Sequence, residues 1–219
     1  MSLADLLTTQ EGAENQHIYG VVVGIVTSNQ DPDGLGRVKV SFPWRGGSDE
    51  SYWARIASPM AGNERGMVFY PEVSDEVLVA FEQGDINRPY VVGGLWNGKD
   101  KPPEPNANGK NNIRKIKSRS GHEFIFDDSK DEKKEKIEIH TSGGHRITLD
   151  DTAGSEKIEI VDKTGTNSIT IDSVQNSVAI NSSMQLKIKA NMMEIEADTT
   201  MTLKAGATLT LQGALVKIN

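Results

Sequence analysis

The chain has 219 residues and no cysteine, and its 31 acidic and 24 basic side chains give a formal net charge of −7. The missing cysteines exclude a disulfide framework and thiolate metal sites, and the acidic excess argues against binding to a phosphate backbone. No segment approaches the roughly 20 apolar residues of a membrane-spanning helix. Residues 1–17 lack the basic start and apolar core of a signal peptide, so we expect synthesis in the cytoplasm and export by a dedicated machine.

Composition divides the chain into four stretches. Residues 1–17 form a polar leader. Residues 18–98 contain short apolar runs between turn signals, the pattern of a small, closed or partly open Greek-key barrel. Residues 99–112 are rich in proline and asparagine and are predicted to be an extended linker. Residues 113–219 are repetitive, and the whole chain is predicted to be all-β.

Five or six strands are predicted in the barrel, in the segments YGVVVGIVT, RVKVSFPW, YWARIAS, MVFY, EVLVAF and YVVGGLW. Glycines inside these segments indicate bulges that bend the strands around the barrel: Gly20, Gly24, Gly93 and Gly94. A nucleic-acid groove needs exposed aromatic rings in a basic surface, and this domain is acidic. We therefore expect the aromatic residues to fill the core or a contact between chains: Trp44, Trp53, Tyr90 and Trp96.

The repeats begin with a long period. The segments GHEFIFDD, GHRITLDD and GTNSITID align with one another, and KIEIH, KIEIV and SVAIN lie between and after them. Each repeat is therefore predicted to be a pair of short alternating strands, with loops that shorten toward the C-terminus.

From Asn191 the repeat tightens to blocks of about eight residues, each with an apolar pair. We predict that these pairs form the core of a trimer: Met193, Ile195, Met201, Leu203, Leu209, Leu211, Val216 and Ile218. Small or polar residues between the blocks suit tight corners, at 197–200, 205–207 and 213–214. A single-chain solenoid needs roughly 20 residues or more per turn, so eight residues make about one side of a triangle. Three chains are therefore expected to close an intertwined, homotrimeric β-helix needle.

Three long strings in the barrel, GIVTSNQDPDGLGRVKVSFPW, YWARIASPMAGNERG and PEVSDEVLVAFEQGDINRPYVVGGLWNGKDKPP, resemble the OB-fold domain of VgrG spike proteins and of phage baseplate spikes. The resemblance extends into the β-helix. It implies a membrane-puncturing spike at the tip of a contractile injection system, such as a type VI secretion apparatus, a phage-tail-like particle or a phage baseplate. It also implies delivery outward as part of the particle, toward a target cell envelope, with effector cargo as a further partner.

The chain departs from the full-length VgrG pattern because only about seventeen residues precede the barrel, where many relatives have a large hub domain. The resemblance then implies either a separate hub or baseplate protein that contacts the leader, or a chain that has been cut. At the other end, a conical PAAR-repeat protein caps the needle in the resembled family. We predict that such a cap docks on the last residues: Ala214, Leu215, Val216, Lys217, Ile218 and Asn219.

Chemistry-bearing residues are sparse. His122 and His145 occupy equivalent repeat positions and are expected to face water, although a trimer could place either in a threefold ring. The acidic pairs 127–128 and 150–151 recur in successive repeats, which is typical of structural turns and not of an active site. The chain has no G-x-S-x-G, H-E-x-x-H or P-loop motif. We expect no enzymatic activity, no metal, no cofactor and no nucleic-acid partner. The alternative is a trimeric tail fibre or adhesin that binds glycans through the barrel.

Overall fold

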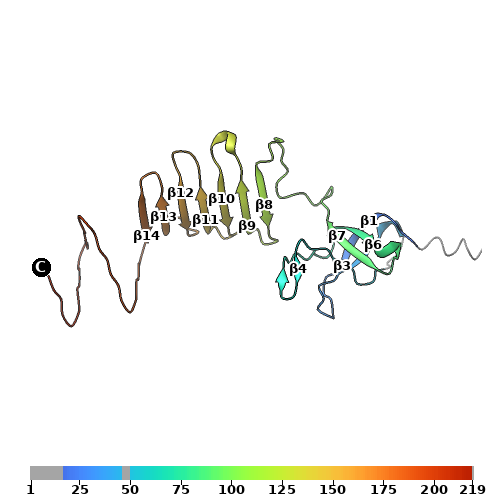
Figure 1. Cartoon of the computed structure of the whole chain (residues 1–219), viewed down its shortest axis with the longest axis horizontal. Coiled ribbons are helices and arrows are strands. Elements are labelled where there is room, and N and C mark those ends of the chain that lie inside the picture. Colours follow the sequence, from blue (N-terminus) through green and yellow to red (C-terminus); the bar gives the residue numbers. More distant parts are fainter. Residues whose placement is uncertain (1–16, 46–49, 219) are drawn as a thin grey trace, which may run out of the picture. The chain divides into compact units, whose positions relative to one another are not determined.

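The computed structural model describes residues 17–45 and 50–218. The chain forms two compact units, divided between Lys117 and Ser118 (Figure 1). The described residues are all-β apart from three short 3-10 turns, η1 (Pro43–Arg45), η2 (Glu82–Gly84) and η3 (Lys130–Glu132). This confirms the predicted all-β class. The predicted leader lies outside the described residues except for His17.

The first unit contains a five-stranded sheet with the order β2-β1-β6-β7-β3. Its strands are β1 (Val21–Ser28), β2 (Lys39–Ser41), β3 (Arg55–Ile56), β6 (Glu76–Phe81) and β7 (Pro89–Gly94). Neighbours pair antiparallel except β3 and β7, which are parallel. Val38 also pairs with Ala54, with N–O distances of 3.0 and 2.7 Å, and thereby joins β2 to the start of β3. The sheet therefore curls toward closure, as expected of an OB barrel.

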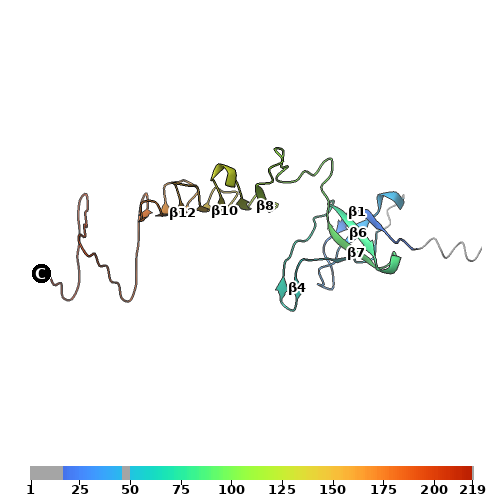
Figure 2. The same ribbon diagram turned by 45° about the horizontal axis from the view of Figure 1, so that its top comes forward.

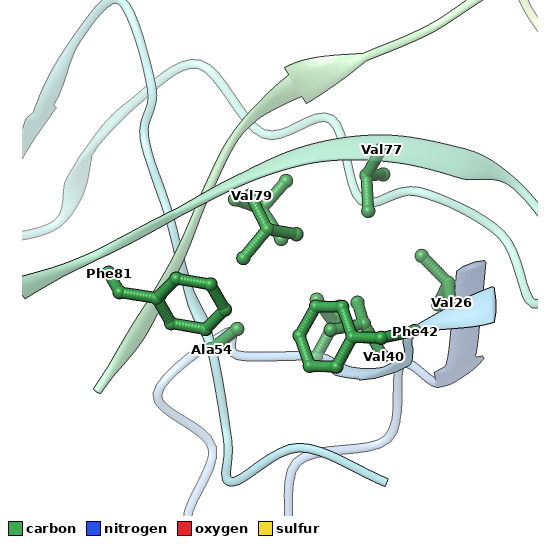
Figure 3. Packing of buried hydrophobic residues seen from close by; sticks show 9 residues of the cluster. Val26, Val40, Phe42, Ala54, Val77, Val79 and Phe81 are labelled. Carbon is green, nitrogen blue, oxygen red and sulfur yellow. The ribbon is translucent and has the colours of Figure 1, made fainter. Parts of the chain in front are cut away.

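Alternation along β6 explains the barrel core. Val77, Val79 and Phe81 are buried, while the residues between them are partly exposed, because successive side chains of a strand point to opposite faces. Side chains in or next to the other strands complete the cluster, which Figure 3 shows in part: Val26, Val38, Val40, Phe42, Ala54 and Val91. The core is thus built mainly from valines, which suit a pleated surface.

Two predictions for the barrel need correction. The segment 67–70 is not a strand. Its side chains are exposed, and although Met67 donates its backbone N–H to the Met60 carbonyl at 3.0 Å, no regular strand pairing follows. Instead, the predicted connection before it forms a small hairpin of β4 (Ala61–Gly62) and β5 (Arg65–Gly66). Gly24 is not at a bulge either: a Cβ there would lie 3.2 Å from Val79 Cγ2, so glycine is needed for close packing. A register shift does occur beside Gly93, since Leu78 pairs with Gly93 and Val79 with Val91.

Beyond the barrel, a seven-stranded sheet follows the chain order from β8 to β14. Its strands are β8 (Ile113–Lys117), β9 (Glu123–Asp127), β10 (Lys136–His140), β11 (Arg146–Asp150), β12 (Lys157–Val161), β13 (Ser168–Asp172) and β14 (Ser177–Asn181). The pairings from β9 to β14 are all antiparallel and without register shifts. The paired strands predicted from the repeats are confirmed. The loops shorten on one side only: 128–135, 151–156 and 173–176.

After β14 the described chain contains no further strand (Figure 1). The backbone runs in straight segments and bends at 183–184, 191–192, 198–199, 206–207 and 214, which is once every seven or eight residues. The last three bends fall at the corners predicted from the small and polar residues. That these segments join a β-helix needle stays a prediction, because a single chain offers them no partner strand.

Candidate assembly surfaces

One face of the sheet from β9 to β14 consists entirely of large apolar side chains; we call it the apolar face. It follows from the register, because residues directly opposite each other on neighbouring strands lie on the same face. One row of cross-strand neighbours is Phe124, Ile139, Ile147, Ile160, Ile169 and Ile180. The second row is Phe126, Ile137, Leu149, Ile158, Ile171 and Val178.

The apolar face is uncovered in the single chain. Ten of its twelve side chains are exposed, with exposed fractions between 37% and 67%. In Figure 2 the strands of this unit lie in one layer, so among its described residues no second layer packs on the sheet. A contiguous apolar surface of this kind marks an interaction site in a folded protein.

The opposite face is mostly polar; we call it the polar face. Ile125 and Thr148 are buried on it, and the Thr148 hydroxyl has no hydrogen-bond partner among the described residues. Lys136 lies 3.2 Å from Glu138, and the repeat places Lys157 3.1 Å from Glu159 in the same way. Asp and Lys also alternate across the strands, in the row Asp127, Lys136, Asp150, Lys157 and Asp172. Opposite charges directly across a strand pair stabilise the sheet and suit contact with water. The sheet is therefore amphipathic, and only its apolar face lacks a partner.

Turns at one end of the strands are joined by a repeated hydrogen bond. The Nδ1 atom of His122 accepts from the backbone N–H of Ser142 at 3.2 Å, and His145 does the same with Lys163 at 3.2 Å. In the next repeat the Oδ1 atom of Asn167 accepts from the backbone N–H of Ser183 at 3.0 Å. The equivalent histidines predicted from the repeats therefore connect successive turns of one chain. The sequence showed their equivalence but not this role.

The recurring acidic residues also serve turns, as predicted. Asp127 Oδ1 accepts from the backbone N–H of Ser129 at 3.1 Å, and Asp150 Oδ1 accepts from that of Thr152 at 2.9 Å. Burial raises the pKa of Asp150, but hydrogen bonds from Thr152 and the charges of nearby lysines outweigh it and lower the pKa overall. Among the described residues, no three His, Asp or Glu side chains are grouped so that they could hold a metal ion. The described part of the chain also has no helix long and apolar enough to cross a membrane.

The residues predicted to form the trimer core lie in the straight segments after β14. The first three pairs occupy alternate positions between two bends, and the last pair follows the final bend. All eight side chains are exposed in the single chain: Met193, Ile195, Met201, Leu203, Leu209, Leu211, Val216 and Ile218. Of the predicted cap-docking residues, Leu215 is 74% and Ile218 86% exposed. Asn219 lies outside the described residues. Both assignments remain predictions.

The barrel carries a groove that the sequence did not indicate. Trp53 and Tyr90 line it together with the arginines at positions 37, 55 and 88, and its volume is about 580 Å³. None of the four aromatic residues expected in the core or at a contact between chains is buried in the core; Trp44 and Trp96 are exposed, and their place at a chain contact stays a prediction. The core is too small for them once the valines have filled it. The sequence offers only Arg37 and Lys39 on one segment and Trp53 and Arg55 on another, and no local pattern indicates that the two segments lie side by side.

Comparison with known protein families decides the nature of the barrel. Residues 22–96 match the model of the type VI secretion system/phage-baseplate injector OB domain. The chain therefore carries an injector OB domain and is related to VgrG and phage-baseplate spike proteins. The injector OB domain match covers the curled sheet from β1 to β7.

The curated relatives that this chain matches are much longer proteins, and the match spans only about a tenth to a fifth of their length. The chain is 30% identical over 151 residues to type VI secretion system spike protein VgrG1c of Pseudomonas aeruginosa. The aligned region covers 60% of this chain and 21% of the relative. It is 36% identical over 126 residues to VgrG5 of the same organism, with coverages of 48% and 16%. It is 27% identical over 131 residues to a Vibrio cholerae protein named actin cross-linking toxin VgrG1, with coverages of 58% and 10%.

The D-P-D-G-L-G-R string that carried the spike-family resemblance folds around one carboxylate. Asp31 accepts from the backbone N–H groups of Asp33, Leu35 and Arg37 at 3.1, 3.1 and 3.2 Å, and from the Arg37 guanidinium at 2.8 Å. The Arg37 side chain and these N–H groups hold the pKa of Asp31 well below its usual range, although partial burial acts in the other direction. These contacts close the loop just before β2 begins.

Proposed function

We propose that the chain is the non-enzymatic, homotrimeric spike of a contractile injection system. The observation that carries this proposal is the uncovered apolar face from β9 to β14, in a chain that also carries an injector OB domain. Three copies of a sheet with one apolar face can turn those faces toward a common axis and keep the polar faces in water. The exposed apolar pairs after β14 extend the same core toward the tip.

The free energy gained by burying the apolar face in a trimer is large enough to support assembly. Complete burial of a large aliphatic side chain contributes about 1.5 to 3 kcal/mol, so burying the remaining half contributes roughly 1 kcal/mol. Ten such side chains on the apolar face then supply roughly 10 kcal/mol per chain before the entropy of association is subtracted. That gain is comparable with the whole stability of an ordinary domain. Folding of the repeats and association of the chains are therefore coupled.

The proposed trimer acts mechanically. Strands that lie side by side along the chain, with paired charges outside and packed apolar residues inside, form a stiff shaft that transmits axial force to a target cell envelope. We place a separate hub or baseplate protein at the N-terminal side and a PAAR-type cap on residues 214–219. The particle carries the spike outward together with any effector cargo. No catalytic chemistry is required, and the recurring histidines and aspartates are engaged in turns.

Light scattering coupled to size-exclusion chromatography tests the oligomeric state. We expect a particle of three times the 23.9 kDa mass of one chain, which persists in SDS without heating. A single-chain particle with protected backbone amides throughout residues 121–218 contradicts the trimer.

A pull-down with a PAAR-repeat protein tests the cap. Deletion of residues 212–219 is expected to abolish capture, whereas the Lys187→Glu variant, which is changed on the shaft away from the tip, is expected to retain it. Capture by the shortened chain refutes the docking site.

A further inference from the structure

The groove on the barrel lies where three strands and two loops meet. Arg37 and Lys39 flank the pairing of Val38 with Ala54, so they lie beside the segment that holds Trp53 and Arg55. Arg55 pairs directly with Tyr90 of the parallel strand β7. The loop that ends at Arg37 lines one part of the groove, and the loop after β6 lines another with Glu82, Asn87 and Arg88. We call this site the aromatic groove.

Each aromatic ring of the groove has a cation beside it. The Arg37 guanidinium lies 5.9 Å and the Lys39 ammonium 5.5 Å from the Trp53 ring centroid, while the Arg55 guanidinium lies 5.6 Å from that of Tyr90. Both rings are only partly buried. A volume of about 580 Å³ is within the usual range for small-ligand sites, which combine aromatic walls with a few polar groups.

Charge in and around the aromatic groove is nearly balanced. Arg37 is held by Asp31 at 2.8 Å, Lys39 by Glu50 at 3.0 Å, and Arg88 lies 3.5 Å from Glu82. Among the described residues, Arg55 is the groove arginine without a carboxylate within ion-pair distance. A phosphate backbone gains its affinity from an excess of cations, and the carboxylates here repel it. Hydroxyl groups, in contrast, donate to carboxylates and accept from guanidinium groups.

We propose that the aromatic groove binds a short oligosaccharide. The Trp53 and Tyr90 rings provide apolar surfaces for sugar rings, Glu82 accepts hydrogen bonds from hydroxyl groups, and Arg55 donates to hydroxyl or carboxylate oxygens. The second and third strands of an OB barrel and the loops beside them are also where this fold binds oligomeric ligands. The site goes beyond the spike function and does not depend on it, since the groove is formed within one barrel.

A glycan array of immobilised neutral, N-acetylated and uronic-acid oligosaccharides, probed with the full-length chain, tests for binding. The dissociation constant of the oligosaccharide with the strongest signal is then measured by calorimetry. Trp53→Ala and Arg55→Ala are each expected to weaken binding about tenfold, the usual loss for a stacked ring or a hydrogen bond to a charged group. Trp96→Ala and Arg65→Ala, matched changes at exposed positions outside the groove, are expected to bind as the unchanged chain does.

Circular dichroism verifies that each variant is folded. If Trp53→Ala is not, Arg55→Ala decides, because the Arg55 side chain is exposed and carries no core packing. The proposal is overturned if no oligosaccharide on the array binds, or if both groove variants bind as the controls do. It is also overturned if a labelled oligothymidylate binds more tightly than every oligosaccharide and loses affinity steeply with salt, which identifies a nucleic-acid site.

Discussion

The apolar face can be tested with two neighbouring residues of β12. Ile160 lies in the middle of this face, between Ile147 and Ile169 on the adjoining strands, and is 46% exposed in the single chain. Val161 follows it in the sequence but belongs to the polar face, directly across from Arg146. Introducing aspartate at either position changes the same strand by the same charge. Only the first position is predicted to lie inside the trimer.

The expected loss of association free energy follows from the exposed fraction of the Ile160 side chain. Burying the exposed half of the side chain contributes about 1 kcal/mol per chain, and therefore about 3 kcal/mol per trimer. Ile160→Ala is then expected to weaken trimer formation about a hundredfold. Ile160→Asp also places three unpaired carboxylates in an apolar interior, at a cost of several kcal/mol each, so it is expected to abolish the trimer. Val161→Asp gains a neighbouring guanidinium and is expected to remain trimeric.

Sedimentation equilibrium over a hundredfold range of protein concentration measures the three association constants. Circular dichroism of the same samples reports whether the barrel is still folded, since its valine core does not involve β12. If Ile160→Asp forms the same trimer as Val161→Asp, with an unchanged melting temperature, the apolar face is not the surface that joins the chains.

Three further predictions concern other parts of the chain. Asp31→Ala removes the acceptor of three backbone N–H groups and of the Arg37 guanidinium, so the melting temperature of the barrel is expected to fall by several degrees in calorimetry. Hydrogen bonds from Asn167 and Thr164 lower the pKa of Asp162 to about 2. Its stabilisation is therefore complete above the unfolded pKa of about 3.9 and is lost as pH falls through 2, which thermal melts between pH 6 and pH 2 measure; an unchanged melting temperature contradicts this. Asn167→Ala removes the last turn-to-turn hydrogen bond, and faster hydrogen exchange at the Ser183 amide is expected by mass spectrometry.

The strands were predictable where local pattern decides them. In β9 to β14 the apolar residues alternate, and aspartate is the last residue of β9, β11 and β13, so period and turn chemistry agree. The segment 67–70 has the same apolar composition, yet it is not a strand. Met67 donates to the Met60 carbonyl, but the segment then runs beside residues 56–59 without a ladder of backbone hydrogen bonds. Trp44 and Trp96 do not join the core for a related reason: the sequence gives their size but not the space left after Phe42 and Phe81 have packed against the valines.

The candidate surfaces divide in the same way. The apolar face follows from alternation, so it could be predicted, whereas the aromatic groove depends on the pairing of Val38 with Ala54 and of Arg55 with Tyr90. Those contacts join segments far apart in the sequence, and no local pattern specifies them. The turn contacts of His122 and His145 were visible only as an equivalence between repeats, since the donor lies in the following turn.

The change of repeat length along the chain explains why the backbone is paired within one chain from β9 to β14 and is not paired after it. From β9 to β14 each hairpin returns the chain beside itself, so every inner strand finds both hydrogen-bonding neighbours within the same polypeptide. After β14 the chain turns by a bend and moves on, and among the described residues 186–218 form no backbone hydrogen bond with one another. Backbone N–H and C=O groups in an apolar needle must nevertheless be paired. In the proposed trimer the other chains supply those partners, so we predict that pairing within one chain gives way to pairing between chains where the repeat shortens to eight residues.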